Sequence, residues 1–96
     1  MSLITELIDL ENYLMNLEAK GFKFKDDAIS FIYFGKQSTG TDDHVVSLAI
    51  ELTLKTQKRF DGSFYLSLLE TFKENHIRTK TEAYRLMENI GLKAHN

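Results

Sequence analysis

Cationic and hydroxyl side chains precede the last predicted helix of this 96-residue chain. Arg78, Thr79, Lys80 and Thr81 stand at its start, and Glu82 follows Thr79 by three residues. This Thr-to-Glu spacing is typical of a capping box, in which the hydroxyl and the carboxylate each accept from a backbone amide. Because the positive end of the helix dipole and its free amides attract anions, the segment predicts a phosphate contact.

A second polar set follows the alternating stretch 45–54, in which every second residue is large and apolar. That period of two predicts a half-buried strand. The alternation continues beyond Leu54 and places Lys55, Gln57 and Arg59 on one face. On a β-ribbon such side chains can reach base edges in a major groove, where Arg and Lys suit guanine and Gln suits adenine. The alternative is a solvated strand end, where Lys and Arg also prevent edge aggregation.

The sequence gives little support for a catalytic site. His44, His76 and His95 lack the helical spacing of a metal site, and no cysteine supplements them. There is no glycine-rich phosphate loop and no Ser, His and Asp set in a known local signature. The sequence predicts no enzyme, no cofactor and no small-molecule substrate.

Length and charge set the remaining limits. Ninety-six residues suffice for a single domain, 1–96, around one core. Residues 1–54 hold four basic and nine acidic side chains, whereas 55–96 hold eight and five, which suggests one basic face. Glu6 and Asp9 are wrong for a signal peptide, and no apolar run approaches the roughly 18–20 residues of a membrane span. We expect a cytoplasmic protein without a membrane partner.

Hydrophobic periodicity and turn residues predict the remaining elements. A helix is expected over 3–19, with Ser2 as its N-cap and Gly21 as its stop. The aromatic and β-branched stretch 28–34 predicts a strand, and the polar stretch 35–43 a loop, so that 28–54 would form an antiparallel hairpin.

Two helices are expected in the remainder of the chain. Asp61 and the two residues after it open a helix that ends near Asn75, and a turn leads to a helix over 80–90 that stops at Gly91. The predicted fold class is therefore α+β, with an N-terminal helix, a β-hairpin and a C-terminal helix pair in the order α-β-β-α-α.

A polar-faced strand, an amphipathic helix, a short turn and then Arg-Thr-Lys-Thr-Glu-Ala resemble the ribbon-helix-helix family of DNA-binding regulators and antitoxins, over roughly 53–92. The resemblance implies a homodimer whose paired strands enter the major groove of duplex DNA. Ribbon positions would fall on Lys55, Gln57 and Arg59. Phosphate anchors would fall on Thr79, Lys80 and Thr81. The sequence departs from that pattern in the turn, where Asn75 and His76 stand in place of a glycine, and in the ribbon, which is normally an isolated N-terminal strand.

The other function open to the sequence is binding of a protein partner, as inhibitors, immunity proteins or adaptors of phages and mobile elements do. Acidic pairs near the expected hairpin ends would steer the chain toward a basic partner. Exposed aromatic side chains would act as anchors unless they fill the core. The residues of this alternative are Asp26, Asp27, Phe31, Tyr33, Asp42 and Asp43.

Overall fold

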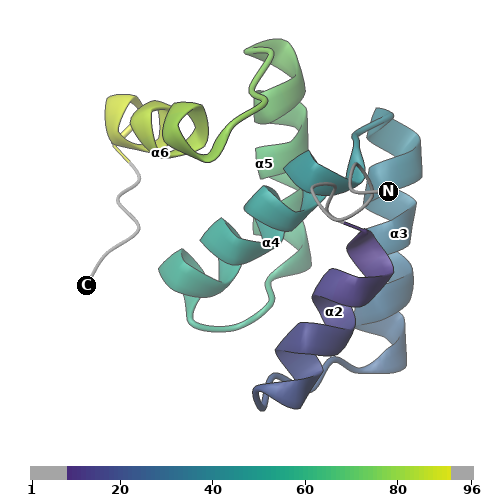
Figure 1. Ribbon diagram of the computed structural model, residues 1–96. Helices are drawn as coiled ribbons and strands as arrows, with labels where there is room; N and C mark the ends of the chain where they lie inside the picture. The colour runs from purple at the N-terminus through teal and green to yellow at the C-terminus, as the bar shows by residue number, and fades with distance from the viewer. Residues whose placement is uncertain (1–8, 92–96) are drawn as a thin grey trace, which may run out of the picture.

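The computed structural model describes residues 9–91, and within that range every regular element is a helix (Figure 1). The helices are α2 (Leu10–Ala19), α3 (Asp26–Thr39), α4 (Asp43–Gln57), α5 (Gly62–Glu74) and α6 (Lys80–Asn89). The predicted α+β class is therefore wrong, because both strands of the expected hairpin are helical. None of the helices within residues 9–91 has the length and apolar character that crossing a bilayer requires.

The first predicted helix is confirmed from Leu10 onward. Asp9 is extended (φ −91°, ψ 122°), and its carboxylate caps α2 by accepting from the amide of Glu11. A single helix over 3–19 is thus wrong, because a cap interrupts it; the expected cap Ser2 and residues 3–8 lie outside the described range. Gly21, at φ +108°, confirms the predicted stop.

The stretch expected as the first strand, 28–34, lies within α3. Ile32, Gly35 and Thr39 are buried, and their spacing of three and four residues forms one stripe along a helix. The predicted loop 35–43 instead contains the last turn of α3, a left-handed C-cap at Gly40 (φ +66°) and the first residue of α4. Aromatic and β-branched side chains favour strands only weakly, and packing between helices overrides that preference here.

The stretch expected as the second strand, 45–54, lies within α4, which is buried on nearly all sides. A helix that is enclosed by its neighbours needs no polar face, so its sequence loses the period of 3.6. Ser47 and Thr53 lie in the core because each hydroxyl donates to a carbonyl of the same helix, at 2.6 Å to His44 and 2.7 Å to Ala49. The alternation that predicted a strand therefore reflects small residues inside a buried helix.

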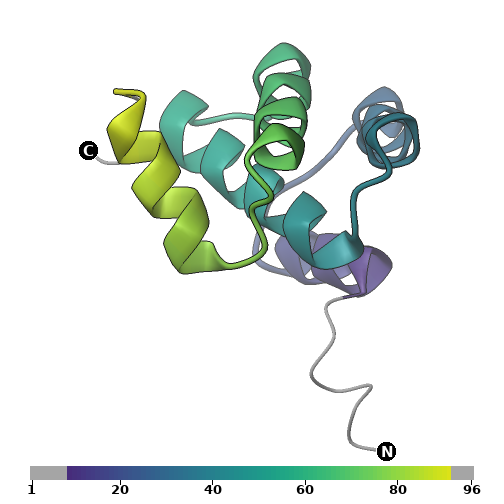
Figure 2. The same cartoon turned by 90° about the horizontal axis from the view of Figure 1, so that it is seen from above.

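α4 lies at the centre of the fold, and the other helices surround it (Figure 2). α5 packs against both α3 and α4, and α2 packs against α4. Leucine, valine and isoleucine dominate the core, with Tyr65, Phe72 and Met87 as its largest other members. One hydrophobic cluster thus joins all five described helices.

The predicted C-terminal helix pair is confirmed. Asp61 caps α5 by accepting from the amide of Phe64 at 3.0 Å, and Asn75 is its C-cap. His76 adopts φ +55°, the left-handed conformation that a glycine adopts more easily. The connection therefore makes a sharp turn despite lacking glycine, and α6 begins after Thr79 as the sequence predicted.

Candidate functional site

The two predicted DNA-contacting lysines, Lys55 and Lys80, meet at the junction of α4 and α6. Tyr84 donates a hydrogen bond to Glu51 at 2.8 Å and accepts one from the Lys55 ammonium, also at 2.8 Å. Lys80 lies 3.2 Å from the same Glu51 carboxylate. The hydrogen bond to Tyr84 is the main reason that the pKa of Lys55 is raised above 10.5. Both cations are thus occupied in joining two helices, although their side chains are largely exposed.

The backbone amides at the start of α6 are also occupied, because Thr79 and Glu82 form a capping box. Thr79 accepts from the amide of Glu82 at 3.1 Å, and the Glu82 carboxylate accepts from the amides of Arg78 at 2.8 Å and Thr79 at 3.2 Å. These backbone donors lower the pKa of Glu82, so the group is ionised at neutral pH. A carboxylate therefore stands where the resemblance places a phosphate. Lys80 and Thr81 are exposed at this helix start.

The ribbon positions do not form a ribbon. Lys55 and Gln57 lie in the last turn of α4, and Lys58 ends that helix in the left-handed conformation (φ +65°). Arg59 follows in the connection to α5, with Nη2 at 3.3 Å from a carboxylate oxygen of Asp61. The strand that a ribbon requires is absent from residues 53–59, which the structure describes in full.

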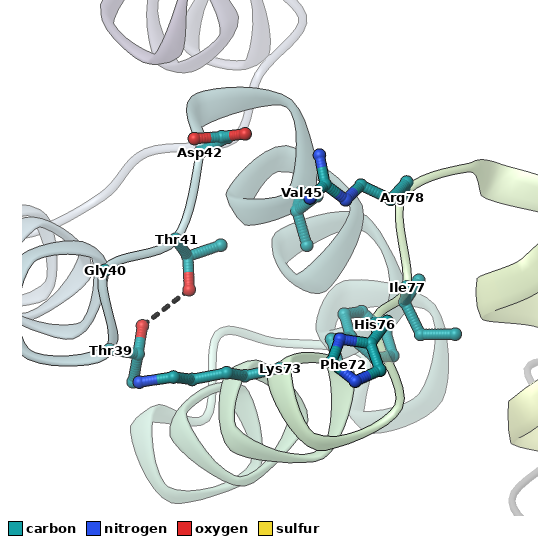
Figure 3. Close-up of a pocket in the computed structure, with 10 residues that line it drawn as sticks. All are labelled: Thr39, Gly40, Thr41, Asp42, Val45, Phe72, Lys73, His76, Ile77 and Arg78. Atoms are coloured by element: carbon teal, nitrogen blue, oxygen red, sulfur yellow. Dashed lines mark hydrogen bonds between the residues drawn. The ribbon is translucent and has the colours of Figure 1, made fainter.

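Arg78 lies instead at a pocket of about 240 Å³ between the α3–α4 and α5–α6 connections. We call it the basic pocket, because Lys73, His76 and Arg78 form one side of it (Figure 3). Thr39, Gly40, Thr41 and Asp42 form the facing side, and the buried side chains of Val45 and Phe72 lie between them. The pocket therefore combines Arg78 and Asp42, which the sequence had assigned to different functions.

A wider hollow of about 890 Å³ lies at the opposite end of α3, between the α2–α3 and α4–α5 connections. We call it the aromatic groove, because Phe24, Phe31 and Phe60 line it. The rings of Phe24 and Phe60 meet edge to face at 6.0 Å, and Phe60 lies 5.3 Å from Tyr65 in the core. Its charged lining consists of Lys23, Lys25, Asp27, Arg59 and Asp61.

The residues predicted for a protein partner do not share one surface. Asp26 and Asp27 begin α3, whereas Asp42 and Asp43 follow its end, about 21 Å away at 1.5 Å per residue. Asp43 has a structural role, since it accepts from the amide of Leu10 at 3.1 Å. Tyr33 is half-buried. Burial is the main reason that its pKa is raised, and nearby acidic side chains raise it further.

Sequence reasoning named Asp27, Phe31 and Arg59 of the aromatic groove but assigned them to different functions and did not join them into one site. Of the basic pocket it predicted only Asp42 and Arg78 as site residues. Lys23, Phe24 and Lys25 alternate cation, ring and cation, which is a local signal for a mixed binding surface. No local signal connects Lys73 or His76 to Thr41, because more than 30 residues separate them in the chain. Within residues 9–91 no group of three acidic, histidine or cysteine side chains is arranged to hold a metal ion.

The fold and these surfaces define a small helical protein in which the basic pocket and the aromatic groove, two hollows of unlike chemistry, lie at opposite ends of α3. The chain belongs to a family described as a family of unknown function, DUF6123, which matches residues 5–93. No curated protein and no solved structure matches the chain.

Proposed function

We propose that this chain is a small non-enzymatic protein that binds a segment of a partner protein in the aromatic groove. The observation that supports this function is the groove itself, where three phenylalanine rings lie among charged side chains. Protein interfaces are typically built from an apolar, aromatic centre with a polar rim. The groove thus supplies an anchoring surface of the kind that the acidic residues predicted from sequence do not form.

The charges of the groove favour a partner segment with acidic side chains. Lys23 and Lys25 are exposed and have no ion pair among residues 9–91, whereas Arg59 is paired with Asp61. Of the two carboxylates that line the groove, Asp61 is paired with Arg59, and Asp27 has no ion pair within residues 9–91. An apolar segment that carries Asp or Glu opposite the two lysines matches this pattern.

Binding of nucleic acid in the groove has weaker support. Phe31 packs on Gly62, where a Cβ would lie 3.0 Å from its ring, and Phe60 packs on Tyr65. Rings engaged with one another in this way offer few free faces for base stacking. For this reason we place DNA binding, the first function expected from the sequence, second.

Selection of peptides from a random display library tests the proposed function, followed by fluorescence-polarisation titration of the selected peptides. We expect peptides that combine aromatic or aliphatic residues with Asp or Glu. The double reversal Lys23→Glu/Lys25→Glu should weaken their binding at least about tenfold. Its matched control is Lys20→Glu/Arg85→Glu, which reverses two exposed charges outside the groove. Equal affinity of both variants, or no acidic preference among the peptides, would contradict the proposal.

A titration with random-sequence duplex DNA at low and physiological salt decides between the two functions. We expect no saturable binding, because Lys55, Lys80 and Arg59 have carboxylate partners, which leaves Arg78 as the cation of the predicted set that is unpaired within residues 9–91. Micromolar binding that weakens steeply with salt would indicate phosphate contacts and favour the regulator function instead.

A further inference from the structure

The basic pocket is a second site whose chemistry the proposed function does not use. It lies at the end of α3 opposite the aromatic groove, and the two share no lining residue. Three basic side chains, from the last turn of α5 and the connection that follows it, line the pocket, against one carboxylate, that of Asp42. The excess of positive charge favours an anionic ligand.

The basic side chains approach the pocket from different directions. In Figure 3 the Lys73 side chain extends toward Thr39, whereas Arg78 lies near Val45 and Asp42. None of Lys73, His76 and Arg78 has a side-chain hydrogen bond or ion pair within residues 9–91. Glu70 and Glu74 lie with Lys73 and His76 at an adjoining hollow and do not line the pocket. Several free donors around one point suit phosphate, which offers acceptor oxygens in several directions.

The facing side of the pocket offers an acceptor. Thr39 donates its only hydroxyl proton to the carbonyl of Gly35, at 2.7 Å. Thr41 must therefore be the donor in the 2.6 Å contact between the two threonine hydroxyls. The Thr41 oxygen is left with lone pairs, and the Asp42 carboxylate beside it makes no side-chain bond to its helix. A ligand hydroxyl can donate to either group.

The pocket is held in shape from both sides. The Lys36 ammonium donates to the carbonyl of Thr41 at 3.2 Å and lies 3.1 Å from Asp43, which fixes the α3–α4 connection. On the other side, Ile77 donates from its amide to Phe72 at 2.9 Å, which fixes the turn that carries His76. A site whose walls are already ordered loses little entropy when a ligand binds.

The size of the pocket limits the ligand. Its 240 Å³ is below the roughly 300–1,000 Å³ of typical cofactor and drug sites. A phosphate group with a short hydroxylated carbon chain fits this volume, whereas a dinucleotide would extend out of the pocket.

We propose that the basic pocket binds a small phosphorylated molecule that carries at least one free hydroxyl group. Lys73, His76 and Arg78 hold the phosphate, and either Thr41 or Asp42 accepts the hydrogen bond from the hydroxyl. Such a ligand would make this chain a sensor or carrier of small phosphorylated compounds, independently of the partner segment in the aromatic groove.

Amide chemical-shift titrations of the full chain test this site, with glycerol phosphate, inorganic phosphate, glycerol and sodium chloride as separate probes. We expect saturable shifts confined to the two connections around Gly40 and Ile77. Glycerol phosphate should bind more tightly than inorganic phosphate, and glycerol alone should not bind. Sodium chloride at equal ionic strength controls for screening. Shifts that do not saturate, or that spread over the surface, would overturn the proposal.

Variants separate the two halves of the proposed ligand. Lys73→Gln and Arg78→Gln should each weaken glycerol phosphate binding about tenfold, as loss of one charge-assisted contact does. Arg85→Gln, on the exposed face of α6, is the control and should leave the affinity unchanged. The double variant Thr41→Val/Asp42→Ala removes both acceptors and should remove the preference for glycerol phosphate over inorganic phosphate. The same spectra show whether each variant is folded. If Arg78→Gln binds as the unaltered protein does, the pocket is not the site.

Discussion

The hydroxyl of Tyr65 donates a hydrogen bond to the backbone carbonyl of Ile32 at 2.7 Å, which joins α5 to α3 inside the core. Both side chains are fully buried. This contact depends on Gly35, because a Cβ there would lie 2.9 Å from the Tyr65 ring and 3.0 Å from Leu69. The glycine thus allows the close approach of two helices, although its backbone angles are those of an ordinary helix.

Gly35→Ala should therefore destabilise the protein. Helix propensity favours alanine by about 1 kcal/mol, but overpacking of a dense core costs about 1–3 kcal/mol. We expect chemical denaturation to show a net decrease of up to about 2 kcal/mol in the free energy of unfolding. Ser30→Ala, at an exposed position of the same helix, is the control and should be neutral or slightly stabilising. Equal gains in both variants would show that the contact between α3 and α5 is looser than described.

Asp43→Ala should loosen the attachment of α2. The carboxylate of Asp43 accepts from the amide of Leu10, a buried residue, and also contacts Lys36. Leaving that amide without an acceptor should lower the free energy of unfolding by about 1–3 kcal/mol. Asp42→Ala is a matched control, since this neighbouring carboxylate is exposed and makes no cap bond; its cost should stay within about 0.5 kcal/mol. Hydrogen exchange of the α2 amides should report the difference.

The capping box makes stability depend on acidic pH. The pKa of Glu82 is lowered in the folded state by the amides of Arg78 and Thr79, so the ionised form stabilises the fold. That contribution is complete above the unfolded-state value of 4.5 and is lost as pH falls through the lower folded-state value. Thermal unfolding of Glu82→Gln should lose this part of the pH dependence. A melting curve with the same acid dependence in both proteins would contradict the role of the carboxylate.

Tyrosine ionisation should occur late on an alkaline titration. Burial, aided by the charge of Glu51, raises the pKa of Tyr13 to about 12, and burial also raises the pKa of Tyr65. Because the folded state prefers the neutral form, this contribution is complete below the unfolded-state value of 10.0 and is lost as pH rises toward 12. Ultraviolet difference spectra of Tyr13→Phe should lack a late-ionising group. Loss of an early-ionising group instead would show that Tyr13 is open to solvent.

The homodimer expected from the sequence remains a prediction. Leu10 and Leu14 of α2 are buried, but Met15 on the same helix is 57% exposed. Light scattering should give twice the chain mass of 11.1 kDa, and Met15→Glu should shift the population toward the monomer if α2 forms the contact. Asn16→Glu adds the same charge at an exposed neighbouring position and should leave the mass unchanged.

Much of the C-terminal half could be predicted because its signals are local. Asp61, Thr79 with Glu82, and Gly91 mark helix ends through bonds or backbone angles within a few residues. The capping box was correctly predicted, but its consequence was not. In a complete capping box the Glu82 carboxylate accepts from backbone amides that a phosphate would need. The pattern that predicted a phosphate site at this helix start therefore argues against one.

The sequence by itself determined the end of α2, the bounds of α5 and α6, the capping box and the cationic character of the second half. Tertiary structure alone decided that 28–34 is helical, because packing between helices overrides the weak strand preference of its side chains. Tertiary structure likewise made 45–54 helical, because α4 is enclosed on nearly all sides and no polar face remains to show a helical period. It also decided that Lys55 and Lys80 meet at Glu51, and that Arg78 faces Thr41 across a pocket. Such pairings depend on how the helices pack across one another, and the local sequence around each residue does not specify that packing.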